Sequence, residues 1–175
     1  MVIVFTGNGK GKTTAALGQM IRALGRGKRA LMIQFIKGPW RSGEDELFEK
    51  FGIPPEKFEI KKMGKGFVGI LGDKLPREEH VKAAETAFSC FTEELAKGDR
   101  FLYVLDEVNI AVSLGLLKSE RVLEAIRDFP NNKILIMTGR GAPQAFLSRA
   151  DLVTEMREIK HPFQDGKLAE IGIEF

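Results

Sequence analysis

The chain has 175 residues, 27 basic and 24 acidic side chains, a net charge of +3 and one cysteine. This length suits one domain over residues 1–175, and so mild a charge without a long basic run argues against a nucleic-acid partner. One cysteine excludes an intrachain disulfide, and no apolar run reaches the roughly 18 residues that span a membrane. Because the first residues resemble a strand rather than a signal peptide, we expect a cytoplasmic protein without a membrane partner.

Apolar runs of strand length alternate along the chain with segments of helical periodicity. In chain order we predict a strand at 2–5, a helix at 12–24 stopped by Gly25, a strand at 29–36, a helix at 43–52, a strand at 58–63, a helix at 77–97, a strand at 100–107, a helix at 119–129, a strand at 133–139, a helix with Pro143 in its first turn and a last strand at 152–160. Residues 63–77 are rich in glycine and predict a mobile loop.

Strands that alternate with helices predict an α/β fold with a mostly parallel central sheet and helices on both faces, in the three-layer architecture of RecA-like P-loop NTPases. Ligands of such sheets bind at the carboxyl ends of the strands. Polar clusters follow three of the predicted strands, at Thr6–Thr14, Asp106–Glu107 and Thr138–Arg140. We therefore expect these clusters to share one site.

The stretch FTGNGKGKTT, at 5–14, is a glycine-rich turn between a predicted strand and a predicted helix. Backbone N–H groups and the positive end of the helix dipole converge at such a turn, which predicts a nucleoside triphosphate site. Lys12 would reach the outer phosphates, and the Thr13 hydroxyl would bind Mg²⁺. The spacing is unusual because Thr6 stands where the common motif has glycine, and Lys10 adds a cation. The predicted nucleotide-binding residues are Gly7, Asn8, Gly9, Lys10, Gly11, Lys12, Thr13 and Thr14.

Two acids end one of the predicted strands. A carboxylate at this place in a P-loop protein holds the metal ion, directly or through water, so Asp106 and Glu107 join Thr13 as candidate metal ligands. In a hydrolase one acid would instead activate water, and an acid pair that only ends a strand is a further alternative. Arg140, after the next strand, is a candidate for binding a phosphate or ribose oxygen, and a surface salt bridge explains it about as well.

These blocks together resemble the ATP:corrinoid adenosyltransferase family of the P-loop type. The matching stretches follow one another over nearly the whole chain: TGNGKGKTTAALG, QFIKGPWRSGE, KMGKGF, VLDEVNIA, TGRGAP, ADLVTEM, IKHPF and the terminal GIEF. The short phosphate loop belongs to this family's own pattern. The resemblance implies transfer of the 5′-deoxyadenosyl group of ATP to the Co(I) of a corrinoid (cobalamin, cobinamide or cobyrinic acid a,c-diamide), with release of triphosphate, in adenosylcobalamin biosynthesis or salvage.

The resemblance also implies which residues act. ATP is expected to lie reversed in the loop, so that the loop cations and a metal ion (Mg²⁺ or Mn²⁺) held by Thr13 and Glu107 stabilise the departing triphosphate. An apolar wedge removes the lower ligand of cobalt, and Phe67 matches its aromatic residue. The catalytic residues implied in this way are Lys10, Lys12 and Phe67. The residues expected to contact the corrinoid are Trp40, Met63, Gly66 and Phe67.

Two departures from the family pattern bear on the substrate and the site. Gly69 stands where typical members have a tryptophan, which favours a corrinoid without the lower base. Many relatives also carry an N-terminal segment that covers the site, whereas a strand begins here at residue 2, so we expect a more open site. The family further implies an electron donor, such as a flavodoxin or a flavin reductase, and a homodimer.

Two other functions fit parts of the sequence: a RecA-like ATPase acting on nucleic acid, and a non-catalytic module that binds ATP and corrinoid. Simpler interpretations also exist for single residues. Without the resemblance, Phe67 reads as a loop anchor packed on the core. Cys90 reads as a small buried apolar residue, and His161, before a proline, as a turn or hydrogen-bonding residue.

Overall fold

A six-stranded parallel sheet forms the centre of the protein, in a computed structural model that describes residues 1–70, 72–162, 166 and 170–173. The strands are β1 (Val2–Thr6), β2 (Ala30–Gln34), β3 (Phe58–Lys62), β4 (Leu102–Asp106), β5 (Ile134–Thr138) and β6 (Leu152–Glu155). Their order across the sheet is β3-β2-β4-β5-β1-β6, and every pairing is parallel. The carboxyl ends of β1, β4 and β5 are therefore neighbours, as the polar clusters require.

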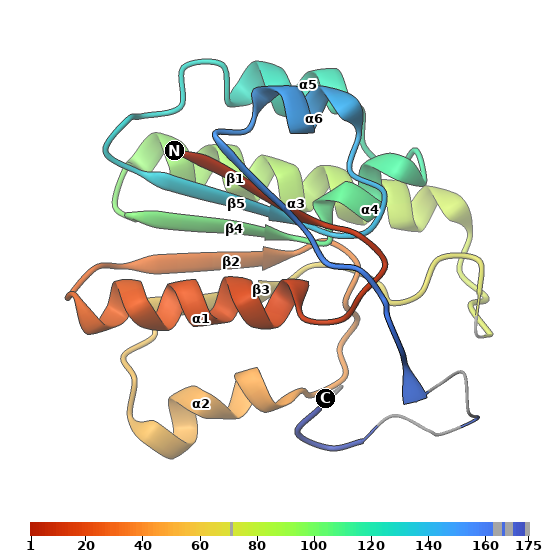
Figure 1. Ribbon diagram of the computed structural model, residues 1–175, viewed down its shortest axis with the longest axis horizontal. Helices are drawn as coiled ribbons and strands as arrows, with labels where there is room; N and C mark the ends of the chain where they lie inside the picture. Colours follow the sequence, from red (N-terminus) through yellow and green to blue (C-terminus); the bar gives the residue numbers. More distant parts are fainter. Residues whose placement is uncertain (71, 163–165, 167–169, 174–175) are drawn as a thin grey trace.

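Helices cover both faces of the sheet (Figure 1). They are α1 (Lys12–Gly25), α2 (Gly43–Phe51), α3 (Arg77–Lys97), α4 (Val108–Ser113), α5 (Ser119–Ala125) and α6 (Gln144–Arg149). Figure 1 shows α1 on one side of the sheet and α5 and α6 on the other. The predicted α/β class, with a parallel sheet between two helical layers, is confirmed.

Each face of the sheet has its own apolar core, because successive strand residues point to opposite faces. In β1, Val2 and Val4 belong to the core shared with α3, α4, α5 and α6. Ile3 and Phe5 belong to the core shared with α1. The central strands are buried on both faces, which explains why they read as continuous apolar runs in the sequence.

Some predicted boundaries are wrong for local reasons. The last strand ends at Glu155 rather than at 160, and the helix predicted to reach 129 ends at Ala125. Pro143 precedes α6 as an extended cap instead of standing in its first turn. The first helix does end at Gly25, as predicted, and the left-handed glycine that follows it is Gly27. Helix α4 was not predicted, since its six residues are too few to show a helical period.

No regular element lies between Lys62 and Arg77 in the part of this stretch that the structure describes, so the prediction of a loop is confirmed, and its predicted mobility stays a prediction. Its far end is tied down by the Asp73 carboxylate. That group accepts hydrogen bonds from the backbone N–H groups of Gly69 (2.8 Å) and Leu75 (3.0 Å) and lies 2.9 Å from His80 Nε2. These contacts hold the end of the loop against the first turns of α3 through His80.

Candidate functional site

The phosphate loop joins β1 to α1, and its glycines are required by close packing as well as by the turn. The chain that follows β6 passes directly over the loop, and Gly9 N–H donates to Met156 O at 2.7 Å. A Cβ at Gly7 would lie 2.4 Å from Met156 O, and one at Gly9 would lie 2.7 Å from the carbonyl carbon of Arg157. Gly11, with φ 109, caps the helix in the left-handed region. A side chain at Gly7 or Gly9 would therefore overlap the backbone after β6, and one at Gly11 would strain the left-handed backbone.

Lys12 is the first residue of α1, and its side chain is folded into the loop. Its ammonium donates to Gly7 O at 2.8 Å and to Gly9 O at 2.6 Å. Burial is the largest influence on this group and lowers the pKa of Lys12, which the nearby Glu107 partly offsets. The ammonium thus lies inside the anion-binding turn, where a phosphate can replace the two carbonyl acceptors.

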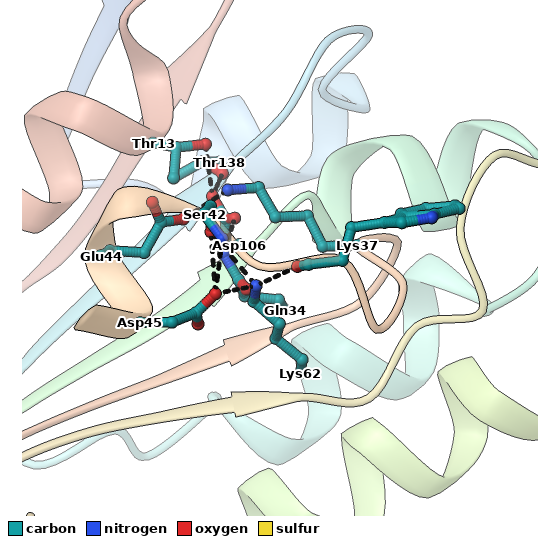
Figure 2. Close-up of polar contacts among 10 residues, drawn as sticks. Thr13, Gln34, Lys37, Ser42, Glu44, Asp45, Lys62, Asp106 and Thr138 are labelled. Atoms are coloured by element: carbon teal, nitrogen blue, oxygen red, sulfur yellow. Dashed lines mark hydrogen bonds and ion pairs between the residues drawn. The ribbon is translucent and has the colours of Figure 1, made fainter. Parts of the chain in front are cut away.

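Asp106, at the end of β4, joins three strand ends in one hydrogen-bonded cluster (Figure 2). Its Oδ1 accepts from Thr13 Oγ1 and from Thr138 Oγ1, each at 2.8 Å. Its Oδ2 accepts from Gln34 Nε2 at 3.1 Å. The Asp106 side chain is fully buried, and its two oxygens are already occupied. Asp106 therefore orients Thr13, and the Thr13 hydroxyl keeps its lone pairs for a cation.

Glu107 has the most unusual environment at this edge of the sheet. It is the one residue other than glycine with a positive φ (64°) among the described residues. Its Oε2 is closed off from solvent and has no hydrogen-bond partner within the described part of the chain. Burial, followed by the charge of Asp106, raises the pKa of Glu107 to about 7. Backbone strain and an unsatisfied buried acceptor both suggest a group that is completed by a ligand.

These residues fit a divalent cation bound together with a nucleotide. Thr13 and Glu107 offer a hydroxyl and a carboxylate, the hard oxygen donors that Mg²⁺ prefers. The described residues contain no cluster of three or more His, Cys, Asp or Glu side chains that could hold a metal ion. Such a sparse donor set suits an ion that keeps several waters and takes further ligands from substrate phosphates.

A pocket of about 610 Å³ lies against the phosphate loop. The loop and the first turn of α1 line one part of it, from Gly9 to Thr14, and Lys37, Gly43 and Glu44 line another. Glu107, Arg140 and His161 complete the polar lining. Of the predicted nucleotide-binding residues, Gly7 and Asn8 do not line the pocket, and Asn8 is exposed.

Two of the predicted corrinoid-contacting residues, Trp40 and Phe67, form an exposed aromatic pair, and neither lines this pocket. The side chains of Trp40 and Phe67 are 60% and 48% exposed, and their ring centroids are 6.0 Å apart. A Cβ at Gly66 would lie 2.5 Å from the Trp40 ring, and Gly66 N–H donates to Ile36 O at 2.8 Å. Phe67 is therefore not a core anchor. The stretch that carries Lys37 is hydrogen-bonded to the loop that carries Phe67.

A family model described as ATP:corrinoid adenosyltransferase BtuR/CobO/CobP matches residues 1–175. The chain belongs to this family. The corrinoid adenosyltransferases of Pseudomonas aeruginosa and Escherichia coli K12 are 41% and 39% identical to it over 175 residues, covering 100% of this chain and 83% and 85% of those proteins. The family predicted from the sequence motifs is thus confirmed.

Among solved structures, a KaiC-like protein from Pyrococcus horikoshii OT3 superposes with a TM-score of 0.46 at 16% identity, covering 91% of this chain and 73% of that one. This likeness is too distant to bear on function.

The motifs that this family shares occupy different places in the structure. Met63 and Gly64 donate their N–H groups to Gln34 O, each at 3.1 Å, which ties the start of the KMGKGF block to the end of β2. His161 of the IKHPF block lines the pocket. Phe163 of that block and residues 174–175 of the terminal GIEF block lie outside the described residues.

Cys90 differs from its predicted environment. It is half-buried rather than buried, and its Sγ lies 3.8 Å from the Lys61 ammonium. Burial is the main influence and raises the pKa of Cys90. The thiol stands on α3 beside the edge strand β3, and it is not among the residues that line the nucleotide pocket of this adenosyltransferase-family chain.

Three polar residues at this site were missed from the sequence: Gln34, Lys37 and Glu44. Gln34 ends β2 and reaches Asp106, and Lys37 and Glu44 line the pocket and pair at 2.5 Å. The rule that ligands bind at the carboxyl ends of parallel strands applies to β2 as well as to β1, β4 and β5. Applied to the stretch after residue 34, that rule would have pointed to Gln34 and Lys37.

Proposed function

We propose that this chain transfers the 5′-deoxyadenosyl group of ATP to the Co(I) of a corrinoid and releases triphosphate. The observation that carries the proposal is the pocket against the phosphate loop, together with an exposed aromatic pair on the segments that follow β2 and β3. The family match over residues 1–175 and the names of the curated relatives support it. We further propose that residues 1–175 act as one nucleotide-binding domain.

The chemistry needs charge stabilisation rather than a base. A cobalt–carbon bond forms at C5′ while the C5′–oxygen bond breaks, and the electron pair leaves with the triphosphate. Co(I) carries no proton that must be removed, so no general base is required. Donors aimed at the departing oxygens lower the barrier. In this chain these donors are the N–H groups of the loop, Lys10 and Lys12, together with Arg140, which also lines the pocket.

A bound Mg²⁺ or Mn²⁺ would neutralise part of the triphosphate charge. Thr13 and Glu107 would hold it, and Asp106 would keep the Thr13 hydroxyl turned towards it. Lys12 has to leave the carbonyls of Gly7 and Gly9 in order to reach a phosphate. In this proposal the loop holds the leaving triphosphate, and the ribose C5′ atom faces the corrinoid.

The corrinoid side of the site is proposed to include Trp40, Met63, Gly66 and Phe67. The support for Phe67 is its exposure together with Trp40 on a glycine-rich loop. Gly69 lacks the aromatic side chain that typical members have, and its missing Cβ would meet nothing within 4 Å. We therefore favour a corrinoid without the lower base, such as cobinamide or cobyrinic acid a,c-diamide.

We propose in addition that the protein works in the cytoplasm as a homodimer and receives electrons from a flavodoxin or a flavin reductase. These proposals rest on the family resemblance. No helix in the described part of the chain is long and apolar enough to cross a membrane. We expect neither a nucleic acid nor a membrane among the partners.

ATP hydrolysis is the second candidate, and one observation favours it. Glu107 has a pKa of about 7 and an unpartnered oxygen, which are the properties of a group that can activate water. One anaerobic assay separates the candidates, with ATP, Mg²⁺ or Mn²⁺, a corrinoid and a strong reductant. A light-sensitive alkyl-cobalt spectrum together with triphosphate supports adenosyl transfer. ADP and orthophosphate as products, or binding of both substrates without an alkyl-cobalt product, would refute it.

A further inference from the structure

The nucleotide pocket contains a cation outside the phosphate loop. Lys37 follows β2, and Phe35 N–H, two residues earlier, donates to Asp106 O at 2.9 Å. This hydrogen bond anchors the Lys37 segment beside the end of β4. The pocket has the loop residues Gly9 to Thr14 on its wall as well as Lys37 and Glu44. An anion in the pocket would therefore meet positive charge from two separate segments of the chain.

Lys37 is held in the pocket by Glu44. Its ammonium lies 2.5 Å from Glu44 Oε1, with side chains 33% and 12% exposed (Figure 2). Burial acts to raise the pKa of Glu44, but the hydrogen bond and the charge of Lys37 outweigh it, and the net effect is a lowered pKa. Lys37 is also close enough to Glu107 for its charge to oppose, weakly, the rise in the pKa of that carboxyl.

Glu44 itself stands on a fixed support. It lies in the first turn of α2, and the start of this helix is tied to β3 by Lys62. The Lys62 ammonium donates to Trp40 O at 2.6 Å and to Ser42 Oγ at 3.1 Å, and it pairs with Asp45. The Lys37–Glu44 pair is thus positioned by hydrogen bonds that tie the start of α2 to Lys62 of β3, as Figure 2 shows.

We propose that Lys37 is a second binding residue for the triphosphate of ATP, which it contacts from a part of the pocket lining outside the phosphate loop. Glu44 is its positioning residue. In the absence of nucleotide Glu44 keeps the ammonium in the pocket, and the triphosphate then takes over as its partner. This inference rests on the proposed function only in taking a triphosphate as the ligand. A cation on this side stabilises charge that accumulates as the triphosphate leaves.

The test is the affinity of the full chain for inorganic tripolyphosphate with Mg²⁺, measured by isothermal titration calorimetry. Replacing Lys37 by Met keeps the length of the side chain and removes its charge. We expect Lys37→Met to weaken tripolyphosphate binding by about 10- to 100-fold, since charge-assisted hydrogen bonds are the strong ones. The affinity for adenosine should stay unchanged. Unchanged tripolyphosphate affinity in Lys37→Met would overturn the proposal.

Two further variants separate binding from mere support of α2. Lys50→Met removes a charge from the same helix, where Lys50 pairs with Glu46 away from the pocket, and it should leave the affinity for tripolyphosphate within about threefold. Glu44→Gln removes the charge that positions Lys37 but leaves Lys37 itself charged, so tripolyphosphate binding should weaken much less than in Lys37→Met. A loss in Glu44→Gln as large as in Lys37→Met would mean that the pair only ties α2 to β2.

The calorimetric titration does not involve a corrinoid, so its failure is distinguishable from failure of the proposed function. An unaltered protein that binds tripolyphosphate through Lys37 but forms no alkyl-cobalt product would refute the adenosyl transfer alone. Should Lys37→Met fail to fold, Lys37→Arg tests the same contact, because it keeps the charge. The affinity of Lys37→Arg for tripolyphosphate should stay within about tenfold of that of the unaltered protein. Complete loss of binding in a folded Lys37→Arg would contradict a charge contact.

Discussion

Replacing Glu107 by Gln should change how the stability of the protein depends on pH. The pKa of Glu107 rises from 4.5 in the unfolded chain to about 7 in the folded protein, mainly through burial. Between these two values the folded protein keeps a proton that the unfolded chain has lost, so the free energy of unfolding falls as the pH rises. A pKa change of this size corresponds to about 3 kcal/mol at most, and partial exposure of the residue reduces it to about 2–3 kcal/mol.

The assay is urea unfolding of the nucleotide-free protein in EDTA at about pH 5 and about pH 8. Between these two pH values the free energy of unfolding of the unaltered protein should fall by about 2–3 kcal/mol more than that of Glu107→Gln. Any constant cost of burying the Gln amide cancels in this comparison, because it is the same at both pH values. Glu120→Gln, on the exposed start of α5, should follow the unaltered protein. Parallel pH dependences for the unaltered protein and Glu107→Gln would show that Glu107 is not held in its protonated form by its surroundings.

The remaining predictions concern the loop and the corrinoid side. Lys12→Ala should lower the rate of adenosyl transfer by about 10²-fold or more while the melting temperature stays near that of the unaltered protein, and near-normal turnover would exclude its assigned role. Gly9→Ala should abolish ATP binding in a fluorescence titration because its Cβ would overlap the Arg157 carbonyl, whereas Gly25→Ala, with open space around it, should bind normally. Gly69→Trp should raise activity on cobalamin more than on cobinamide, at a cost of about 1–2 kcal/mol for the left-handed backbone; equal gains would refute the wedge interpretation.

The geometry of the phosphate loop could be predicted because it is local. A strand, a glycine-rich turn and the first turn of a helix are consecutive in the chain, so the loop and Thr13 can be read from spacing. The parallel sheet could be predicted for a similar reason, since buried strands and amphipathic helices have different apolar periods. Because ligands bind at the carboxyl ends of parallel strands, the position of Asp106 and Glu107 near the loop also follows from the order of the predicted elements.

Contacts between distant segments could not be predicted in this way. The pairing of Trp40 with Phe67 depends on where two loops meet, and that position follows from the backbone bonds between the 34–36 stretch and the 63–66 stretch. The exact length of the last strand was also out of reach, because all four residues of β6 are exposed and carry no buried-strand pattern. Helix α4 is fixed by its packing on β5 rather than by its own sequence.

The sequence by itself determined the glycine-rich turn between the first strand and the first helix and the parallel order of the strands around it, because both follow from residues adjacent in the chain. Only the tertiary structure decided that Lys37 enters the same pocket from β2 and that Glu107 is buried enough for its pKa to reach about 7. The physical reason is that burial and electrostatic fields are sums over neighbours in space, and most of those neighbours come from other parts of the chain.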